Sequence, residues 1–128
     1  VVTPHDGEFV RMGYPIGTDR MAAAAEAACD LNCILLLKGH ETCITDGFSA
    51  YLNKTGNPGM AVGGSGDVLA GIIGSLVAQG VPPYAAAVCG VYLHGAAGDA
   101  AAAKYSQAGM LPTDLIEELG SLFLQFEK

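Results

Sequence analysis

Positive charge is scarce in this sequence, which has six lysine and arginine residues against thirteen aspartate and glutamate residues and a formal net charge of −7. A protein that binds a nucleic-acid duplex needs clustered lysine and arginine to meet the phosphates, so we do not expect nucleic acid as a partner. Long apolar runs are missing too. No segment is long enough to cross a bilayer and no signal peptide is visible, so we expect a cytoplasmic protein without a membrane partner.

Cysteines are few and unpaired in the sequence, since Cys29, Cys33, Cys43 and Cys89 form no C-x-x-C motif. Without matching cysteine or histidine pairs we expect no metal site, and we interpret the four as thiols in a reducing cytosol. Apolar residues are plentiful: 51% of the 128 residues are hydrophobic and only 15% are charged. Such totals allow a buried core and are typical of one globular domain or part of one.

The strands that the sequence predicts are few. Residues 1–3 predict the end of a buried strand that Pro4 stops, and the continuous apolar run 33–39 predicts a strand buried on both faces. Residues 42–53 predict a hairpin around the turn Asp46-Gly47. A parallel sheet needs more strands than these, so we expect a part of a larger α/β layered fold.

Helices account for most of the rest. Residues 7–12 predict a short helix, and the alanine-rich stretch 18–31 predicts a longer one, because alanine has the best helix propensity. A helical apolar stripe runs from about Val68. A further helix is predicted from Pro82 to about Lys104, and a last one after Pro112.

A cluster of glycines stands at the start of the helix predicted near Val68. Gly63, Gly64 and Gly66 belong to the sequence G-G-S-G-D, which is neither a Walker A loop nor a G-x-G-x-x-G motif. Glycine lets a ligand approach the main chain, and the first N–H groups of a helix lack partners, so we expect an anion hole here. Asp67 either stabilises the helix N-terminus or takes a proton from a hydroxyl that attacks a phosphate.

Residues 53–80, NKTGNPGMAVGGSGDVLAGIIGSLVAQG, closely resemble the ADP/ATP-dependent NAD(P)H-hydrate dehydratases of the ribokinase-like superfamily. Three further segments resemble that family in the same order: TPHDGEF, LLLKGHETCI and GVYLHGAAGDAA. Val62 and Ser65 stand where the resemblance leads us to expect threonine, and Asp6 where it leads us to expect proline. The resemblance implies a ribokinase-like α-β-α layered fold, with residues 1–128 as the C-terminal portion of a single domain.

The resemblance also implies a reaction, the dehydration of NADHX or NADPHX to NADH or NADPH. An adenine nucleotide, ADP or ATP with Mg²⁺, would phosphorylate the ring hydroxyl, and phosphate would then leave. Asp67 is implied as the base and a substrate contact, and His5 as a second substrate contact. The implied nucleotide-binding residues are Lys38, Gly39, His40, Glu41, Thr42 and Gly66, and the implied anion hole is formed by Gly64, Ser65 and Gly66.

Several interpretations stay open at this point. The protein could instead be a small-molecule kinase for a sugar or a thiazole alcohol, or an inactive fragment or assembly module. We expect a homo-oligomer. Within the helix that begins near Pro82, we interpret His94 as a structural histidine, Asp99 as facing solvent, and the glycines and alanines as sites of close packing.

Overall fold

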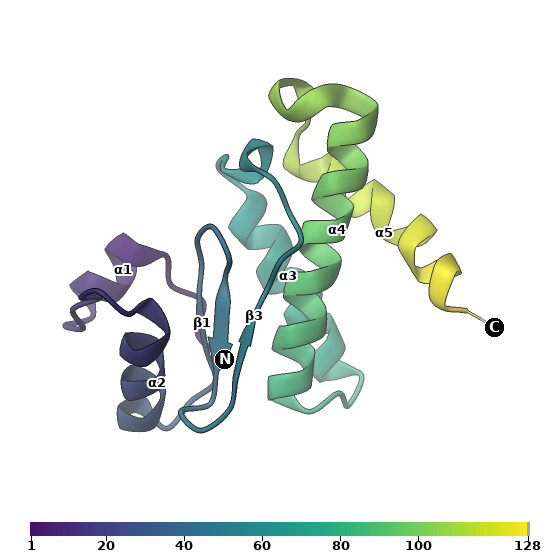
Figure 1. Cartoon of the computed structure of the whole chain (residues 1–128). Helices are drawn as coiled ribbons and strands as arrows, with labels where there is room; N and C mark the ends of the chain where they lie inside the picture. The colour runs from purple at the N-terminus through teal and green to yellow at the C-terminus, as the bar shows by residue number, and fades with distance from the viewer. Residues whose placement is uncertain (128) are drawn as a thin grey trace. The chain divides into compact units, whose positions relative to one another are not determined.

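A computed structural model describes residues 1–127 (Figure 1). The chain divides into two compact units. The first comprises residues 1–53 and 81–88, and the second comprises residues 54–80 and 89 onward. The expectation that residues 1–128 form one portion of a single domain stays a prediction.

The first unit is built on a three-stranded antiparallel sheet of β1 (Leu35–Leu37), β2 (Cys43–Thr45) and β3 (Ala50–Leu52), in the order β1-β2-β3. Leu36 is paired with Ile44, and Ile44 with Tyr51. Residues 2–5 lie parallel to β1, with Val2 opposite Leu35 and His5 opposite Lys38. The hairpin predicted over 42–53 is therefore confirmed, and the strand predicted over 33–39 is confirmed for Leu35–Leu37. The prediction of a buried strand end at residues 1–3 is wrong in its burial, because Val1 and Val2 are exposed and the parallel pairing there consists of isolated bridges.

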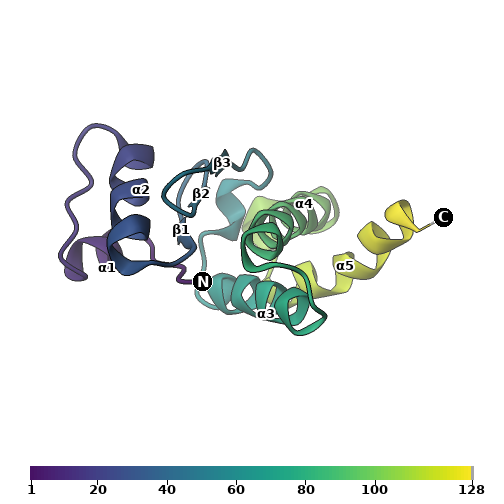
Figure 2. The ribbon, with the colours of Figure 1, turned by 90° about the horizontal axis from the view of Figure 1, so that it is seen from below.

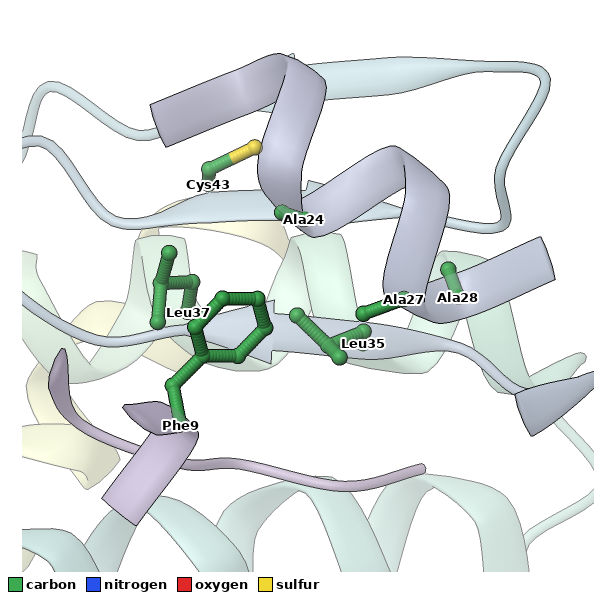
Figure 3. Close-up of a cluster of buried hydrophobic side chains, with 7 residues drawn as sticks. All are labelled: Phe9, Ala24, Ala27, Ala28, Leu35, Leu37 and Cys43. Carbon is green, nitrogen blue, oxygen red and sulfur yellow. The ribbon is translucent and has the colours of Figure 1, made fainter. Parts of the chain in front are cut away.

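Two helices cover one side of this sheet, α1 (Asp6–Arg11) and α2 (Arg20–Leu31) (Figure 2). Both were predicted to within two residues, and Asp19 caps α2 by accepting a hydrogen bond from the Ala22 N–H at 3.1 Å. Figure 3 shows the core that they close, where the ring of Phe9 lies beside two leucines of β1. Its buried members are Phe9, Ala24, Ala27, Ala28, Leu35, Leu37 and Cys43.

The second unit is helical. It contains a short 3₁₀ turn η1 (Pro58–Met60), α3 (Ser65–Ala78), most of α4 (Pro83–Gly109) and α5 (Pro112–Phe126). Its core contains Ala97, Ala101, Met110 and Leu115. The helix α3 begins three residues before the apolar stripe at Val68, and α4 extends five residues past the predicted end at Lys104, interrupted at Ser106.

Candidate functional site

The glycine-rich stretch leads into the N-terminus of α3, where two backbone N–H groups have no hydrogen-bond acceptor among the described residues. Gly64 is the residue before α3, its φ of 97° lies in the left-handed region, and no side chain caps the helix. Ser65 N–H donates to the carbonyl of Val62 at 3.3 Å. Within residues 1–127, the N–H groups of Gly66 and Asp67 have no acceptor. Such N–H groups carry partial positive charge and can hold an anion.

Asp67 lies in the first turn of α3 and is exposed. Its carboxylate makes no hydrogen bond or ion pair with the described part of the chain. The carboxylate is therefore available to accept a proton from a ligand held beside the helix N-terminus.

Ser65 is fixed from α4. His94 Nε2 lies 3.0 Å from the carbonyl oxygen of Ser65 and 3.2 Å from its hydroxyl. Both residues are buried, at 8% exposure for His94 and 7% for Ser65. His94 is thus a buried, hydrogen-bonded histidine, as predicted, but sequence reasoning did not find that its partner is a predicted anion-hole residue.

The segment before the glycines also lies against α4. The Asp99 carboxylate accepts hydrogen bonds from the Gly56 N–H at 3.0 Å and from Asn57 Nδ2 at 2.9 Å. The prediction that Asp99 faces solvent is therefore incomplete. The residue is exposed, but a loop 43 residues earlier in the sequence turns toward its carboxylate.

Glycines of α4 make this approach possible, as predicted. A Cβ at Gly95 would lie 2.6 Å from the backbone carbon of Thr55, and one at Gly98 would lie 2.2 Å from the sulfur of Met60. Real Cβ atoms do not approach other atoms so closely, so any side chain at these positions displaces residues 55–60.

In the first unit, His5 caps α1. Its Nδ1 accepts a hydrogen bond from the Glu8 N–H at 3.1 Å, and the Glu8 carboxylate accepts one from the His5 N–H at 2.9 Å. The backbone N–H of His5, with smaller contributions from the charges of His5, Lys38 and Arg11, lowers the pKa of Glu8. Because Nδ1 is an acceptor, a neutral His5 carries its proton on Nε2.

A predicted substrate contact and a predicted nucleotide contact lie together where residues 2–5 run beside β1. His5 and Lys38 are opposite each other on adjacent parallel segments. Lys38 Nζ lies 3.9 Å from the Glu8 carboxylate, and the two side chains are partly exposed. The structure therefore places a predicted substrate residue next to a predicted nucleotide residue within one unit.

Residues 39–42 form a tight turn at the end of β1. The Thr42 hydroxyl donates to the carbonyl of Gly39 at 3.1 Å and lies 3.4 Å from its N–H. Glu41 has a φ of 55°, which non-glycine residues adopt rarely. His40 and Glu41 are exposed, whereas Thr42 is buried. Thr42 therefore holds the turn from inside, and His40 and Glu41 form its outer surface.

Sequence reasoning missed Arg20. Its Nη2 donates to the carbonyl of Lys38 at 3.1 Å and to the carboxylate of Asp6 at 2.5 Å. A Cβ at Gly39 would lie 2.8 Å from the same Nη2, so Gly39 leaves room for the guanidinium. No local sequence signal connects an arginine at the start of a helix with a strand end 18 residues later.

The described residues 1–127 contain no group of three or more histidine, cysteine, aspartate or glutamate side chains arranged to hold a metal ion. The four cysteines are free thiols, and burial raises the pKa of Cys43. Over the same residues, no helix combines the length and the apolar character needed to cross a membrane.

The family model described as NAD(P)H-hydrate dehydratase matches residues 1–121. Among curated proteins, the chain is 47% identical to a bifunctional NAD(P)H-hydrate repair enzyme of Moorella thermoacetica, covering 100% of this chain and 25% of that protein. It is 45% identical to an ADP-dependent (S)-NAD(P)H-hydrate dehydratase of Neisseria meningitidis serogroup B, covering 77% of this chain and 35% of that one.

Among solved structures, the chain superposes on the ADP/ATP-dependent NAD(P)H-hydrate dehydratase of Bacillus subtilis, co-crystallised with ATP and Mg²⁺, with a TM-score of 0.91 and 36% identity. That match covers 98% of this chain and 47% of the Bacillus protein. The chain therefore spans about half of that solved structure and a quarter to a third of these curated relatives. The ribokinase-like fold predicted from the sequence is confirmed by these neighbours.

Proposed function

The chain belongs to the NAD(P)H-hydrate dehydratase family, and we propose on that basis that the protein uses a nucleotide to dehydrate NADHX and NADPHX. One observation carries the proposal. Asp67, an exposed carboxylate without a partner among residues 1–127, lies in the same helical turn as two N–H groups without acceptors. A base beside an anion hole is what phosphoryl transfer to a hydroxyl requires.

The proposed reaction has two steps. The ring hydroxyl of the hydrated cofactor attacks the terminal phosphorus of the nucleotide, and Asp67 takes the hydroxyl proton. The bond from that phosphorus to the bridging oxygen breaks, and the nucleotide leaves with one phosphate fewer, as ADP from ATP or AMP from ADP. The carbon–oxygen bond then breaks as the lone pair of the ring nitrogen forms a cationic ring, and inorganic phosphate departs. Loss of a proton from the adjacent ring carbon gives the reduced nicotinamide.

Within the first step, the helix N-terminus acts on the phosphoryl group. The N–H groups of Gly66 and Asp67 stabilise the negative charge on the transferred oxygens. Gly64 lies directly before the helix and Ser65 is its first residue. The bare Gly64 supports this role, because a side chain there would already meet Pro112 at 3.3 Å and its φ is unfavourable for other residues.

We propose that residues 38–42 contact the nucleotide and that His5 contacts the hydrated cofactor. Lys38 is a cation at the carboxyl end of β1, where α/β sheets commonly bind ligands. Neutral His5 presents Nε2–H as a donor. The donor is ATP or ADP, with Mg²⁺ bound to its phosphates. We also propose a homo-oligomeric, cytoplasmic protein.

The direct test is Asp67→Asn in the protein at its full length. The amide keeps the size of the side chain but cannot take the proton, so kcat falls by about 10²–10⁴-fold. Nucleotide affinity is retained or increases, because a negative charge near the phosphates is removed. Dehydration is followed as recovery of NADH absorbance, and affinity by calorimetry. Turnover close to that of the unaltered protein would show that Asp67 only stabilises the helix N-terminus.

Gly66→Val is the complementary variant. A valine side chain hinders the approach of a ligand to the main chain. We therefore expect Gly66→Val to lower nucleotide affinity, whereas Asp67→Asn lowers kcat. Product analysis separates the proposed reaction from a kinase reaction. Dehydration yields free phosphate and NADH, whereas a small-molecule kinase yields a stable phosphorylated alcohol.

A further inference from the structure

The hydrogen bonds of His94 fix its tautomer. The carbonyl oxygen of Ser65 can only accept, so the 3.0 Å contact with His94 Nε2 requires a proton on that nitrogen. A bare Nε2 would instead direct its lone pair at the carbonyl oxygen. His94 Nε2–H therefore donates to Ser65, and its hydrogen is shared between the carbonyl oxygen and the hydroxyl oxygen at 3.2 Å.

The protonated Nε2 determines what the Ser65 hydroxyl can do. A hydroxyl oxygen that lies against an N–H cannot donate to it, so the hydroxyl hydrogen of Ser65 points elsewhere. His94 is the one hydrogen-bond partner of the Ser65 side chain among the described residues. Ser65 is only 7% exposed, so its hydroxyl is a buried donor without an acceptor, one residue before the open N–H of Gly66.

We infer that His94 is a positioning residue for phosphoryl transfer, acting through Ser65. Its Nε2–H fixes the first residue of α3 and leaves the Ser65 hydroxyl hydrogen as a donor to the transferred phosphoryl group. This inference rests on the proposed function. It adds a side-chain donor to the backbone donors of the anion hole, and it gives α4 a part in the reaction.

The chain offers a matched pair of substitutions that separates the Nε2 contact from burial. The amide nitrogen of glutamine reaches about as far as Nε2 of histidine, whereas that of asparagine reaches only as far as Nδ1. His94→Asn therefore loses the contact with Ser65, and kcat falls by roughly 10- to 100-fold, the range expected when a donor is misplaced by about 1 Å. His94→Gln recovers most of that loss.

Ser65→Ala completes a double-mutant cycle in the full-length protein. It removes the donor itself, so kcat falls by about 100-fold. In the Ser65→Ala background, His94→Asn lowers kcat by no more than about 2-fold further, because the hydroxyl donor that His94 positions has gone and only its contact with the carbonyl oxygen of residue 65 is left to lose. Equal effects of His94→Asn in both backgrounds, or a loss of folded protein with unchanged kcat per active site, would overturn the inference.

A binding measurement separates this inference from the proposed substrate. ADP with aluminium fluoride imitates the nucleotide with a phosphoryl group in transit. We expect His94→Asn and Ser65→Ala to weaken this complex about 10-fold or more, with the affinity for ADP alone within about 2-fold of the unaltered protein. If the two variants show this pattern but the unaltered protein does not dehydrate NADHX, the proposed substrate is wrong and the role of His94 stands. If ADP with aluminium fluoride does not bind, or if the two variants bind it normally, the role of His94 is refuted.

Discussion

The contact between α4 and residues 55–60 predicts that identical glycine-to-alanine changes will have opposite effects on stability. Gly74, in α3, is exposed, and a Cβ added there would have no neighbouring atom within 4 Å. A Cβ at Gly95 would lie 2.1 Å from Thr55 Oγ1 and 2.6 Å from its backbone carbon. Alanine gains about 1 kcal/mol over glycine in a helix interior. Gly74→Ala should therefore raise the free energy of unfolding by about 1 kcal/mol.

At Gly95 the same gain is opposed by steric overlap. Inserting a methyl into a well-packed site costs about 1–3 kcal/mol, and overlap with backbone belongs at the upper end because no rotamer change relieves it. The overlap at Gly95 thus costs about 3 kcal/mol and the helix gain returns about 1 kcal/mol, so Gly95→Ala should lower the free energy of unfolding by about 2 kcal/mol. The two variants should then differ by about 3 kcal/mol, because Gly74→Ala has the helix gain alone. Gly98→Ala should fall between them, because its neighbour is the flexible side chain of Met60.

Urea unfolding of the three variants, without nucleotide, measures these differences. Equal stabilities of Gly95→Ala and Gly74→Ala would refute the close approach of residues 55–60 to α4. Loss of stability in Gly74→Ala would contradict the open space around that position, and with it the use of Gly74 as the reference.

Two further predictions concern the first unit. The pKa of Glu8 is held below its ordinary 4.5 by the His5 N–H, so its contribution to stability is present above pH 4.5 and is lost as the pH falls through the lowered pKa. Glu8→Gln should accordingly flatten the pH dependence of the unfolding midpoint in that acidic window, and an unchanged dependence would contradict the cap. Asn32 ends α2 with a φ of 49°, so Asn32→Ala should lower stability by about 1–2 kcal/mol in urea unfolding. Asn32→Gly should not, and equal losses in the two variants would exclude backbone conformation as the cause.

Local signals in the sequence were enough to locate several elements. The alanine-rich stretch 18–31 predicted α2, and the Asp46-Gly47 pair predicted the turn between β2 and β3. In both cases the residues act on a backbone only a few residues away. The glycines at 63, 64 and 66 predicted an open helix N-terminus for the same reason. Such features need no knowledge of the rest of the fold.

Local signals in the sequence could not predict whether neighbouring strands run parallel or antiparallel. An apolar run such as residues 33–39 predicts burial on both faces, and β1 is buried along its length. The same burial pattern fits either direction of pairing. β1 has an antiparallel neighbour in β2 and a parallel neighbour in residues 2–5, and the direction follows from the turn 39–42 and from the path of the first residues. Burial patterns record which faces of a strand are covered and leave the direction of its neighbours undetermined.

The α4 residues that contact the candidate site form a pattern in the sequence. The pattern becomes visible only when the residues are placed on a helix. His94, Gly95, Gly98 and Asp99 are spaced i, i+1, i+4 and i+5, so they share one face of α4. The two glycines on that face have no side chains, so another segment of backbone can pack closely against them. The polar side chain at each end of the face can form hydrogen bonds with that segment. In the structure Thr55 lies against Gly95, Gly56 donates to Asp99, and Ser65 accepts from His94. A helix face with paired glycines between polar residues therefore predicts a bound loop, and here the loop leads directly into the predicted anion hole.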